Sequence, residues 1–210
     1  MAEKVSPTRL ELLATKTQIA LAQQGRDLLK EKRKAIMQEF MGVVEDLIEK
    51  GEELERTAAV ARRALALADA FDGDQAVNSA SFAARGEASI AIDRGYLMGV
   101  PVLKFERKNF SRSLVGRGYS LVGTSARIDE VARRFEEELN VVVQVAERQA
   151  TLRLMAAEIQ RTTRRVNALE HVTLPRLLAQ SRRIRMILEE REREDLFRLK
   201  RVKQKIYQRK

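Results

Sequence analysis

The sequence contains no cysteine and no tryptophan, and only three of its 210 residues are proline. Without cysteine the chain can form neither disulfides nor thiolate metal sites, which is typical of proteins in reducing compartments. Aromatic residues reach only 5%, whereas charged residues make up 33% and hydrophobic residues 44%. A composition this charged and this poor in aromatics is typical of long helices rather than of a compact globule. We therefore expect a mainly α-helical protein.

Long apolar runs are also absent. No stretch approaches the ~18 uninterrupted apolar residues that a membrane-spanning helix requires, and Met1–Lys4 leads into no apolar run of the signal-peptide type. The sequence therefore predicts no direct membrane insertion, and any contact with a membrane is expected to run through partner proteins.

A first long helix is predicted over residues 6–72. Ser6 suits its N-cap, Pro7 its first helical position and Gly73 its C-terminal stop. Apolar residues and glycine spaced by 3 and 4 predict a coiled-coil seam, formed by Met37, Phe40, Val44, Leu47, Gly51, Leu54, Ala58, Ala61, Leu65 and Ala68. An earlier series has the same spacing but another phase, which predicts a stutter near residues 31–36: Leu10, Ala14, Thr17, Leu21, Gln24 and Leu28.

A second long helix is predicted over residues 125–206, beginning at Ser125. Its seam includes polar interruptions at Glu138, Gln149 and Thr163, and its apolar members are Ile128, Val131, Phe135, Val142, Val145, Leu152, Ala156, Ile159 and Val166. The phase shifts through Leu169, after which Ile184, Leu188, Leu196 and Leu199 extend an apolar face. Pro175 lacks a backbone donor and predicts a kink, because helical periodicity resumes beyond it.

Residues 73–124 differ in character and predict a small head. Residues 74–85 suit a short helix. Residues 89–92 and 96–105 suit two strands joined by a turn at Asp93-Arg94-Gly95. Gly99 and Pro101 interrupt the second strand, which predicts an edge strand or a bulge. Residues 109–124 contain three glycines and predict a flexible connection.

Two long helices joined by a compact middle pair most economically as an antiparallel coiled coil. If Ala68 faces Ile128, then Leu10 lies near Met186, and the pair spans roughly 90 Å at ~1.5 Å per residue. Residues after about Leu188 would then have no partner within the chain.

Most of the net charge of +10 lies in the last segment, because residues 176–210 carry 13 Lys and Arg against 5 Asp and Glu. Basic tails often bind nucleic acid or anionic lipid. Here, however, acidic residues interrupt the run, and Phe197 and Tyr207 are its only aromatic positions for base stacking. A basic coiled-coil nucleic-acid binder and a generic structural adaptor remain as alternative functions.

No catalytic, cofactor-binding or metal-binding residue is predicted. His171 is the single histidine, with no second metal ligand or triad partner near it in sequence, so a surface or packing role is expected. Gly116-Arg117-Gly118 lacks the lysine and Ser/Thr of a phosphate-binding loop, so a flexible linker is expected. The remaining candidates are expected to be solvated or locally ion-paired: Glu52-Glu53, Glu136-Glu137-Glu138, Arg164-Arg165 and Arg182-Arg183.

Both predicted long helices resemble the D-subunit family of V/A-type rotary ATPases, in which this subunit is the central rotor shaft. In the first helix the matching residues are Ser6-Pro7-Thr8-Arg9, Gly25, Leu28-Leu29-Lys30, Lys32-Arg33 and Glu39-Phe40. In the second they are the run from Thr163 to Glu170, then Pro175, the run from Leu188 to Glu194, and Phe197 to Lys200. In the middle only Met98-Gly99-Val100-Pro101 resembles the family.

The resemblance implies a non-catalytic central-stalk subunit that couples ATP synthesis or hydrolysis to ion transport. It implies four kinds of partner: catalytic and regulatory subunits of the ATPase ring, a small F subunit, and an adaptor to the membrane rotor ring. It also implies a place on the cytoplasmic side of the membrane, in a peripheral part of a membrane complex. Neither nucleic acid nor a cofactor is expected.

Overall fold

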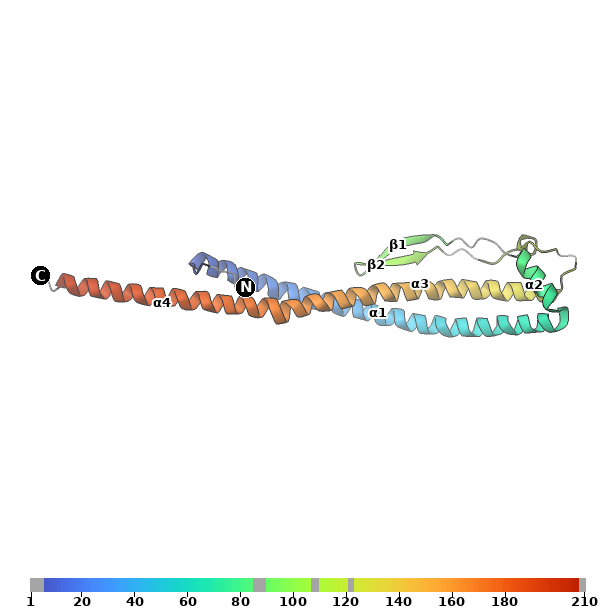
Figure 1. The fold of residues 1–210 in the computed structure, drawn as a ribbon, viewed down its shortest axis with the longest axis horizontal. Helices are drawn as coiled ribbons and strands as arrows, with labels where there is room; N and C mark the ends of the chain where they lie inside the picture. The colour runs from blue at the N-terminus through green and yellow to red at the C-terminus, as the bar shows by residue number, and fades with distance from the viewer. Residues whose placement is uncertain (1–5, 85–89, 107–109, 121–122, 208–210) are drawn as a thin grey trace. The chain divides into compact units, whose positions relative to one another are not determined.

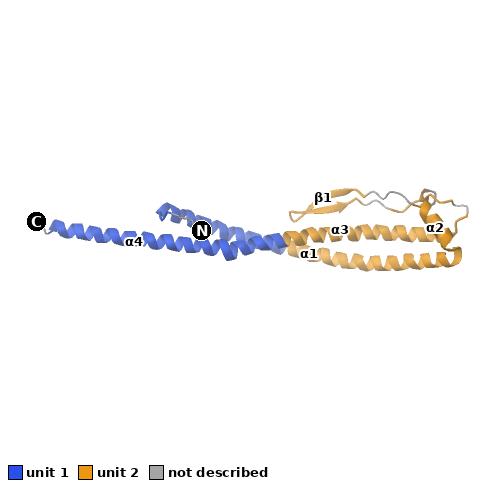
Figure 2. Cartoon of the chain, in the orientation of Figure 1, with its two compact units in different colours: residues 1–34, 160–210 blue, residues 35–159 orange. Residues whose placement is uncertain are grey.

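The structure is a computed structural model that describes residues 6–84, 90–106, 110–120 and 123–207. The elements in chain order are α1 (Arg9–Asp72), α2 (Asp74–Ala83), β1 (Ile92–Leu97), β2 (Val100–Phe105), the 3₁₀ turn η1 (Leu114–Arg117), α3 (Ala126–Ala168), the π-helical turn η2 (Leu169–Thr173) and α4 (Leu174–Tyr207) (Figure 1). The predicted fold class, two long antiparallel helices with a short helix and a hairpin between them, is confirmed. The chain forms two compact units, one of residues 1–34 and 160–210 and one of residues 35–159 (Figure 2).

Helix α1 begins two residues later than predicted. The Thr8 hydroxyl accepts a hydrogen bond from the backbone N–H of Glu11 at 3.2 Å, so Thr8 caps the helix in place of Ser6. Thr8 and Glu11 have the spacing of a capping box. The predicted stop at Gly73 is confirmed, because this glycine adopts a φ of +83° directly after the last helical residue.

The seam of α1 has no stutter at the predicted residues 31–36, and its alternation changes only after Leu47, since the buried Ala58 lies one position past the alternation that reaches Leu47. Buried and half-buried residues alternate by 3 and 4 in the order Leu12, Thr15, Ile19, Ala22, Arg26, Leu29, Arg33, Ile36, Phe40, Val43 and Leu47. The early series is therefore wrong, since Leu10, Leu21 and Leu28 are exposed, and Met37 is exposed where its neighbour Ile36 is fully buried. Polar seam residues such as Thr15 and Arg26 hide the true phase. Further along, the predicted burial of Ala58, Ala61 and Ala68 is confirmed.

Helix α3 begins where predicted, with Ser125 accepting backbone hydrogen bonds from its first turn. The predicted burial of Ile128 and Val166 is confirmed. Three predicted seam positions, Val142, Gln149 and Ala156, are exposed instead, and the buried residues are Val141, Thr151, Met155 and Thr162. The buried residues lie one position before the predicted seam. The apolar pattern misses this phase because two of the buried positions, Thr151 and Thr162, are threonine.

The hairpin exists, but the predicted turn residues Asp93, Arg94 and Gly95 lie within its first strand, and the turn comes later in the chain. Strands β1 and β2 pair antiparallel from Leu97↔Val100 to Ile92↔Phe105, so Met98 and Gly99 form the turn. Both turn residues have positive φ, 49° and 75°, as a tight two-residue hairpin turn requires. Pro101 lies opposite Tyr96 in a regular register, so the edge-strand alternative holds and no bulge is present between the two described strands.

The hairpin packs onto the helices of its own unit. Val100, which is 2% exposed, belongs to a buried cluster with Ile36, Val43 and Met155. Leu97 lies against the same cluster, and β1 and β2 run beside α3 (Figure 1). One face of the hairpin therefore helps to cover the helix pair, and Tyr96 remains exposed.

Candidate functional site

The end of α4 has no partner among the residues that the structure describes. Within its unit the last contacts to α1 are an ion pair of Arg9 with Glu192 at 2.7 Å and a hydrogen bond from Arg191 to the Pro7 carbonyl at 3.1 Å. All residues from 193 to 207 are exposed. The predicted unpaired segment is thus present, but it begins after Glu192 rather than after Leu188, and Met186 does not face Leu10. We call residues 193–207 the α4 end.

The surface of the α4 end combines apolar and basic side chains. Its large apolar residues are all more than half exposed: Leu196, Phe197, Leu199, Val202, Ile206 and Tyr207. Leu196, Leu199 and Ile206 lie one position past the heptad phase of the buried Ser181 and Ile184, so this apolar stripe is offset from the seam that faces α1. The ammonium groups of Lys200 and Lys203 lie over the rings of Phe197 and Tyr207, at 6.0 and 5.8 Å from the ring centroids. An exposed apolar stripe of this kind marks a protein interaction surface.

Helical structure in the α4 end rests on local contacts. Arg193 pairs with Glu190 and Arg198 pairs with Glu194, in both cases between exposed side chains. Exposed pairs of this spacing contribute about 0.3–0.5 kcal/mol each. An isolated helix of this length is marginal in water. The α4 end is therefore suited to be stabilised by a partner that covers its stripe.

In the unit of residues 35–159, a buried arginine fixes the connection that precedes α3. Arg117 lies at the end of η1, and its side chain is 6% exposed. Its Nε and Nη2 donate to the two carboxylate oxygens of Glu136 on α3, and both hydrogen bonds are 3.0 Å long. Its Nη1 donates to the Asp129 carbonyl at 3.2 Å. Hydrogen bonding to Glu136 raises the pKa of Arg117, which therefore stays charged. The predicted flexible linker at Gly116-Arg117-Gly118 is instead a fixed turn.

Two further contacts close this part of the fold. The Tyr119 hydroxyl donates to Asp129 at 2.6 Å, and burial, reinforced by Asp129, raises the pKa of Tyr119. At the junction of α1 and α3, Asp72 accepts from Arg127 at 3.0 and 3.1 Å and from Ser125 at 2.6 Å. Hydrogen bonds from Arg127 and Ser125 lower the pKa of Asp72. Polar contacts thus fix the chain reversal.

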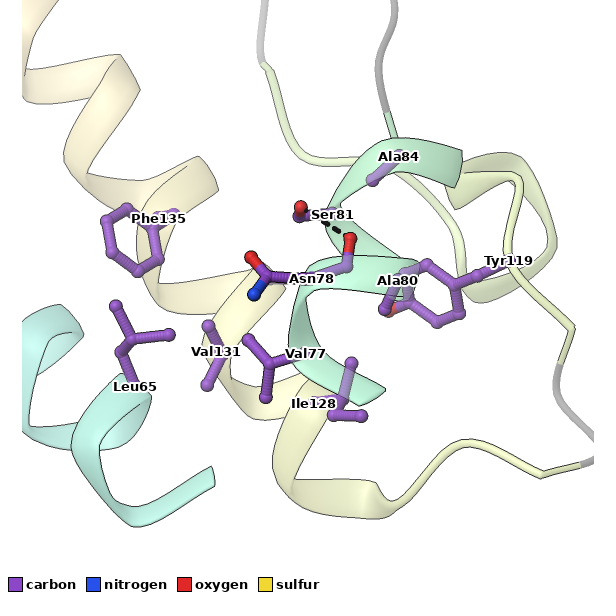
Figure 3. Close-up of a pocket in the computed structure, with 11 residues that line it drawn as sticks. Leu65, Val77, Asn78, Ala80, Ser81, Ala84, Tyr119, Ile128, Val131 and Phe135 are labelled. Carbon is purple, nitrogen blue, oxygen red and sulfur yellow. Dashed lines mark hydrogen bonds between the residues drawn. The ribbon is translucent and has the colours of Figure 1, made fainter. Parts of the chain in front are cut away.

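An apolar pocket of about 410 Å³ lies between α2 and the facing ends of α1 and α3 (Figure 3). Val77 and Ala80 of α2 line it together with Leu65, Ile128 and Phe135. The polar groups at its rim are already occupied: Ser81 donates to the Asn78 carbonyl, and the Asn78 amide donates to Asp74. The pocket therefore offers apolar surface and no convergent polar groups of the kind that orient a small ligand.

The residues considered for chemistry are not brought together. His171 is exposed on η2, and Arg164, Arg165, Arg182 and Arg183 are exposed on their helices. Glu52 and Glu53 pair locally with Arg56 and Lys50. Among the described residues no group of three or more histidine, cysteine or acidic side chains could hold a metal ion.

Sequence reasoning misses the importance of Glu136 and Arg117. Glu136 is expected to be solvated, whereas its side chain is 13% exposed and holds Arg117. Glu138 is expected on the seam, and its Oε2 is buried without a hydrogen-bond partner. The two glycines that flank Arg117 are the available signal, because they permit a tight turn around one long side chain.

Comparison with known proteins identifies the family. Residues 11–204 match the family model described as the D subunit of ATP synthase. The chain belongs to the ATP synthase D-subunit family. The match covers both long helices and the hairpin between them, so the resemblance noted in the sequence is confirmed for almost the whole chain.

Curated relatives agree along nearly their full length. The A-type ATP synthase D subunit of Thermococcus kodakarensis is 41% identical over 199 residues, which cover 95% of this chain and 93% of the relative. That of Halorubrum lacusprofundi is 40% identical, with coverages of 97% and 89%, and that of Methanobrevibacter smithii is 39% identical, with 96% and 87%. This D-subunit chain is thus a rotary ATPase subunit. No described helix is both long and apolar enough to cross a bilayer.

Proposed function

We propose that this D-subunit chain is the non-catalytic central shaft of a V/A-type rotary ATPase. It transmits torque between the catalytic ATPase ring and the membrane rotor that moves ions, and so couples ATP synthesis or hydrolysis to ion transport. The single observation that carries the proposal is the family match over residues 11–204. The exposed α4 end supports it, because an unpaired helix with an apolar stripe suits a surrounding sleeve of other subunits.

The proposal divides the chain into three working parts: residues 6–72, residues 73–124 as a head, and residues 125–206. The α4 end would turn inside the ring of catalytic and regulatory subunits, and the head would face the adaptor to the membrane rotor. A small F subunit would bind the side of the helix pair, on the cytoplasmic side of the membrane. The surface of the shaft differs from one side to the other, so each ring interface contacts a different part of it. Each interface is therefore shifted towards the conformation that binds that part best.

No catalytic, cofactor or metal site is assigned to this chain. Of the carboxylates considered for acid–base chemistry, Glu136 is held by Arg117, and Glu52 and Glu53 pair with basic residues of their own helix. ATP chemistry would then belong to the ring subunits. The purified chain alone is expected neither to bind nor to hydrolyse ATP.

A direct test uses ATPase complex assembled without this chain and reconstituted into sealed vesicles. Adding the full-length chain should restore ATP-driven ion uptake. A chain truncated after Glu192 should assemble less tightly and restore little transport. A matched variant, Arg198→Gln with Lys200→Gln, keeps the apolar stripe and separates the contribution of charge. Full transport without the chain, or salt-sensitive DNA binding with no affinity for the complex, would overturn the proposal in favour of a nucleic-acid-binding role.

A further inference from the structure

The π-helical turn η2 interrupts regular α-helix between α3 and α4. The backbone N–H of Leu174 donates to the carbonyl of Leu169, five residues earlier, where an α-helix would use the residue four earlier. Such turns are rare and occur mainly as single insertions within α-helices, frequently at functional sites. The rotor proposal does not by itself explain why this one is present.

The buried residues show that η2 contains one residue more than the seam needs. Thr162 and Val166 are buried before the turn, and Leu174, Ser181 and Ile184 are buried after it. A heptad repeat that passes through Val166 would next reach positions 173 and 180, but the buried residues lie one position later. The facing part of α1 keeps its spacing of 3 and 4 from Leu12 to Leu29 without an insertion.

The extra residue adds no packing of its own. His171 and Val172, in the middle of η2, are exposed. An α-helix shorter by one residue would bring the same buried side chains to α1, and apart from the bond that Pro175 cannot donate it would have regular hydrogen bonds. Irregular backbone that contributes nothing to the core points to a role outside stability.

Two neighbours fix where the insertion lies. Lys30 on α1 forms an ion pair with Glu170 at 3.0 Å, and this contact lowers the pKa of Glu170. Pro175 follows the turn and has no N–H to donate, so one helical bond is missing there in any case. The insertion is therefore held between a cross-helix ion pair on one side and a proline on the other.

We propose that η2 is a torsional soft point, at which α4 turns about its own axis relative to α3 under load. The proposal rests on the rotor function above. A widened turn beside a missing hydrogen bond twists at lower cost than a continuous α-helix, whose bonds are all made. Lys30 and Pro175 keep the inserted residue from moving along the helix. The torsional flexibility is therefore confined to η2.

The test removes the insertion and leaves the seam in phase. Pro175→Ala serves as the parent in every comparison, so that the proline itself contributes no difference. In that parent, deletion of Val172 should give continuous α-helix with an unbroken seam, and should melt at or above the parent's temperature. Deletion of Ala179 in the same parent is the matched control. It lies in regular helix, moves Ser181 and Ile184 out of the seam, and should lower the melting temperature.

Function is then compared in reconstituted complex, as ions transported per ATP hydrolysed. The Val172 deletion should assemble and hydrolyse ATP but lose coupled transport relative to the Pro175→Ala parent. A melting temperature as low as that of the Ala179 deletion would show that packing needs the extra residue. An unchanged ratio of ions to ATP would show that the soft point has no role; either result overturns the inference. Failure of the wild-type chain to restore any transport would instead overturn the rotor function itself, and with it the load on η2.

Discussion

The buried guanidinium of Arg117 meets both carboxylate oxygens of Glu136, so a two-pronged ion pair joins η1 to α3. A single arginine thereby ties a glycine-flanked connection to a long helix. Because both partners are largely withdrawn from water, losing one of them leaves the other buried and uncompensated.

Glu136→Gln should destabilise unit 35–159 by roughly 3 kcal/mol, because it leaves Arg117 buried without its carboxylate. The Asp129 carbonyl still accepts from Arg117, which keeps the loss towards the low end. Glu137→Gln is the matched control, since Glu137 pairs with Arg133 and Arg134 in the open, and it should cost less than about 1 kcal/mol. Urea denaturation of both variants measures the difference. Equal losses would contradict a structural role for the buried pair.

Gly118 is required by both its conformation and its surroundings. Its φ is +84°, and a Cβ at this position would lie 2.7 Å from the backbone oxygen of Ala83 at the end of α2. Gly118→Ala should therefore cost at least about 1–3 kcal/mol from backbone strain alone. Gly51→Ala is the control, because a Cβ there meets nothing within 4 Å. In the interior of α1 it should stabilise the helix by about 0.5–1 kcal/mol. Thermal melts that move the same way for both variants would refute this account.

The phase of the α1 seam is tested by two adjacent residues. Ile36 is fully buried and Met37 is 43% exposed. Ile36→Ala should cost about 2–4 kcal/mol, because it opens a cavity against Val43 and Met155. Met37→Ala should stay within about 1 kcal/mol of wild type, as a surface change does. The reverse order of melting temperatures would favour the seam through Met37 that the apolar pattern predicts.

These two residues also show why sequence reasoning succeeds for the fold and fails for the phase. The sequence predicts the long helices and the central hairpin from the periodicity of their apolar residues. It predicts the end of α1 because Gly73 readily adopts the positive φ that ends a helix. The seam phase depends on which of two neighbouring positions is buried. Thr15 is buried and Leu10 is exposed, so an apolar count selects the wrong stripe. Only packing against the partner helix decides between them.

The same limit applies to the candidate site. The α4 end could be predicted, because the second long helix is longer than the first. When the two helices pair, the last residues of the second helix must extend past the start of the first, near Pro7. The pairing of Arg117 with Glu136 could not be predicted. Arg117 has its flanking glycines as a local signal, but nothing local distinguishes Glu136 from the other glutamates of a chain that is 33% charged. The hairpin turn is misplaced by sequence reasoning because Met98 is not a residue that favours positive φ.

The stability of the fold should fall in acid, because carboxylates that form ion pairs with arginines become protonated. Hydrogen bonds from Arg133 and Arg134 lower the pKa of Glu130 from 4.5 to about 2, and Arg127 lowers that of Asp72 from 3.8. A carboxylate with a lowered folded pKa contributes stability that is fully present above its unfolded pKa and is lost as pH falls towards the folded value. Melting temperature should thus be steady above about pH 5 and decline between about pH 4.5 and 2. Glu130→Gln should make the decline shallower. A melting temperature that rises as the pH falls through this range would contradict the sign.

The central claim is that this chain turns inside a ring, and a reversible cross-link tests it most directly. The chain has no cysteine, so Leu199→Cys places a single thiol on the exposed α4 end, where Leu199 is 64% exposed. A cysteine on the facing surface of one ring subunit allows a disulfide to join shaft and ring within the assembled complex. If the chain transmits torque by rotation, oxidation should stop both ATP hydrolysis and ion transport, and reduction should restore them. Undiminished hydrolysis and transport by fully cross-linked complex would contradict the account.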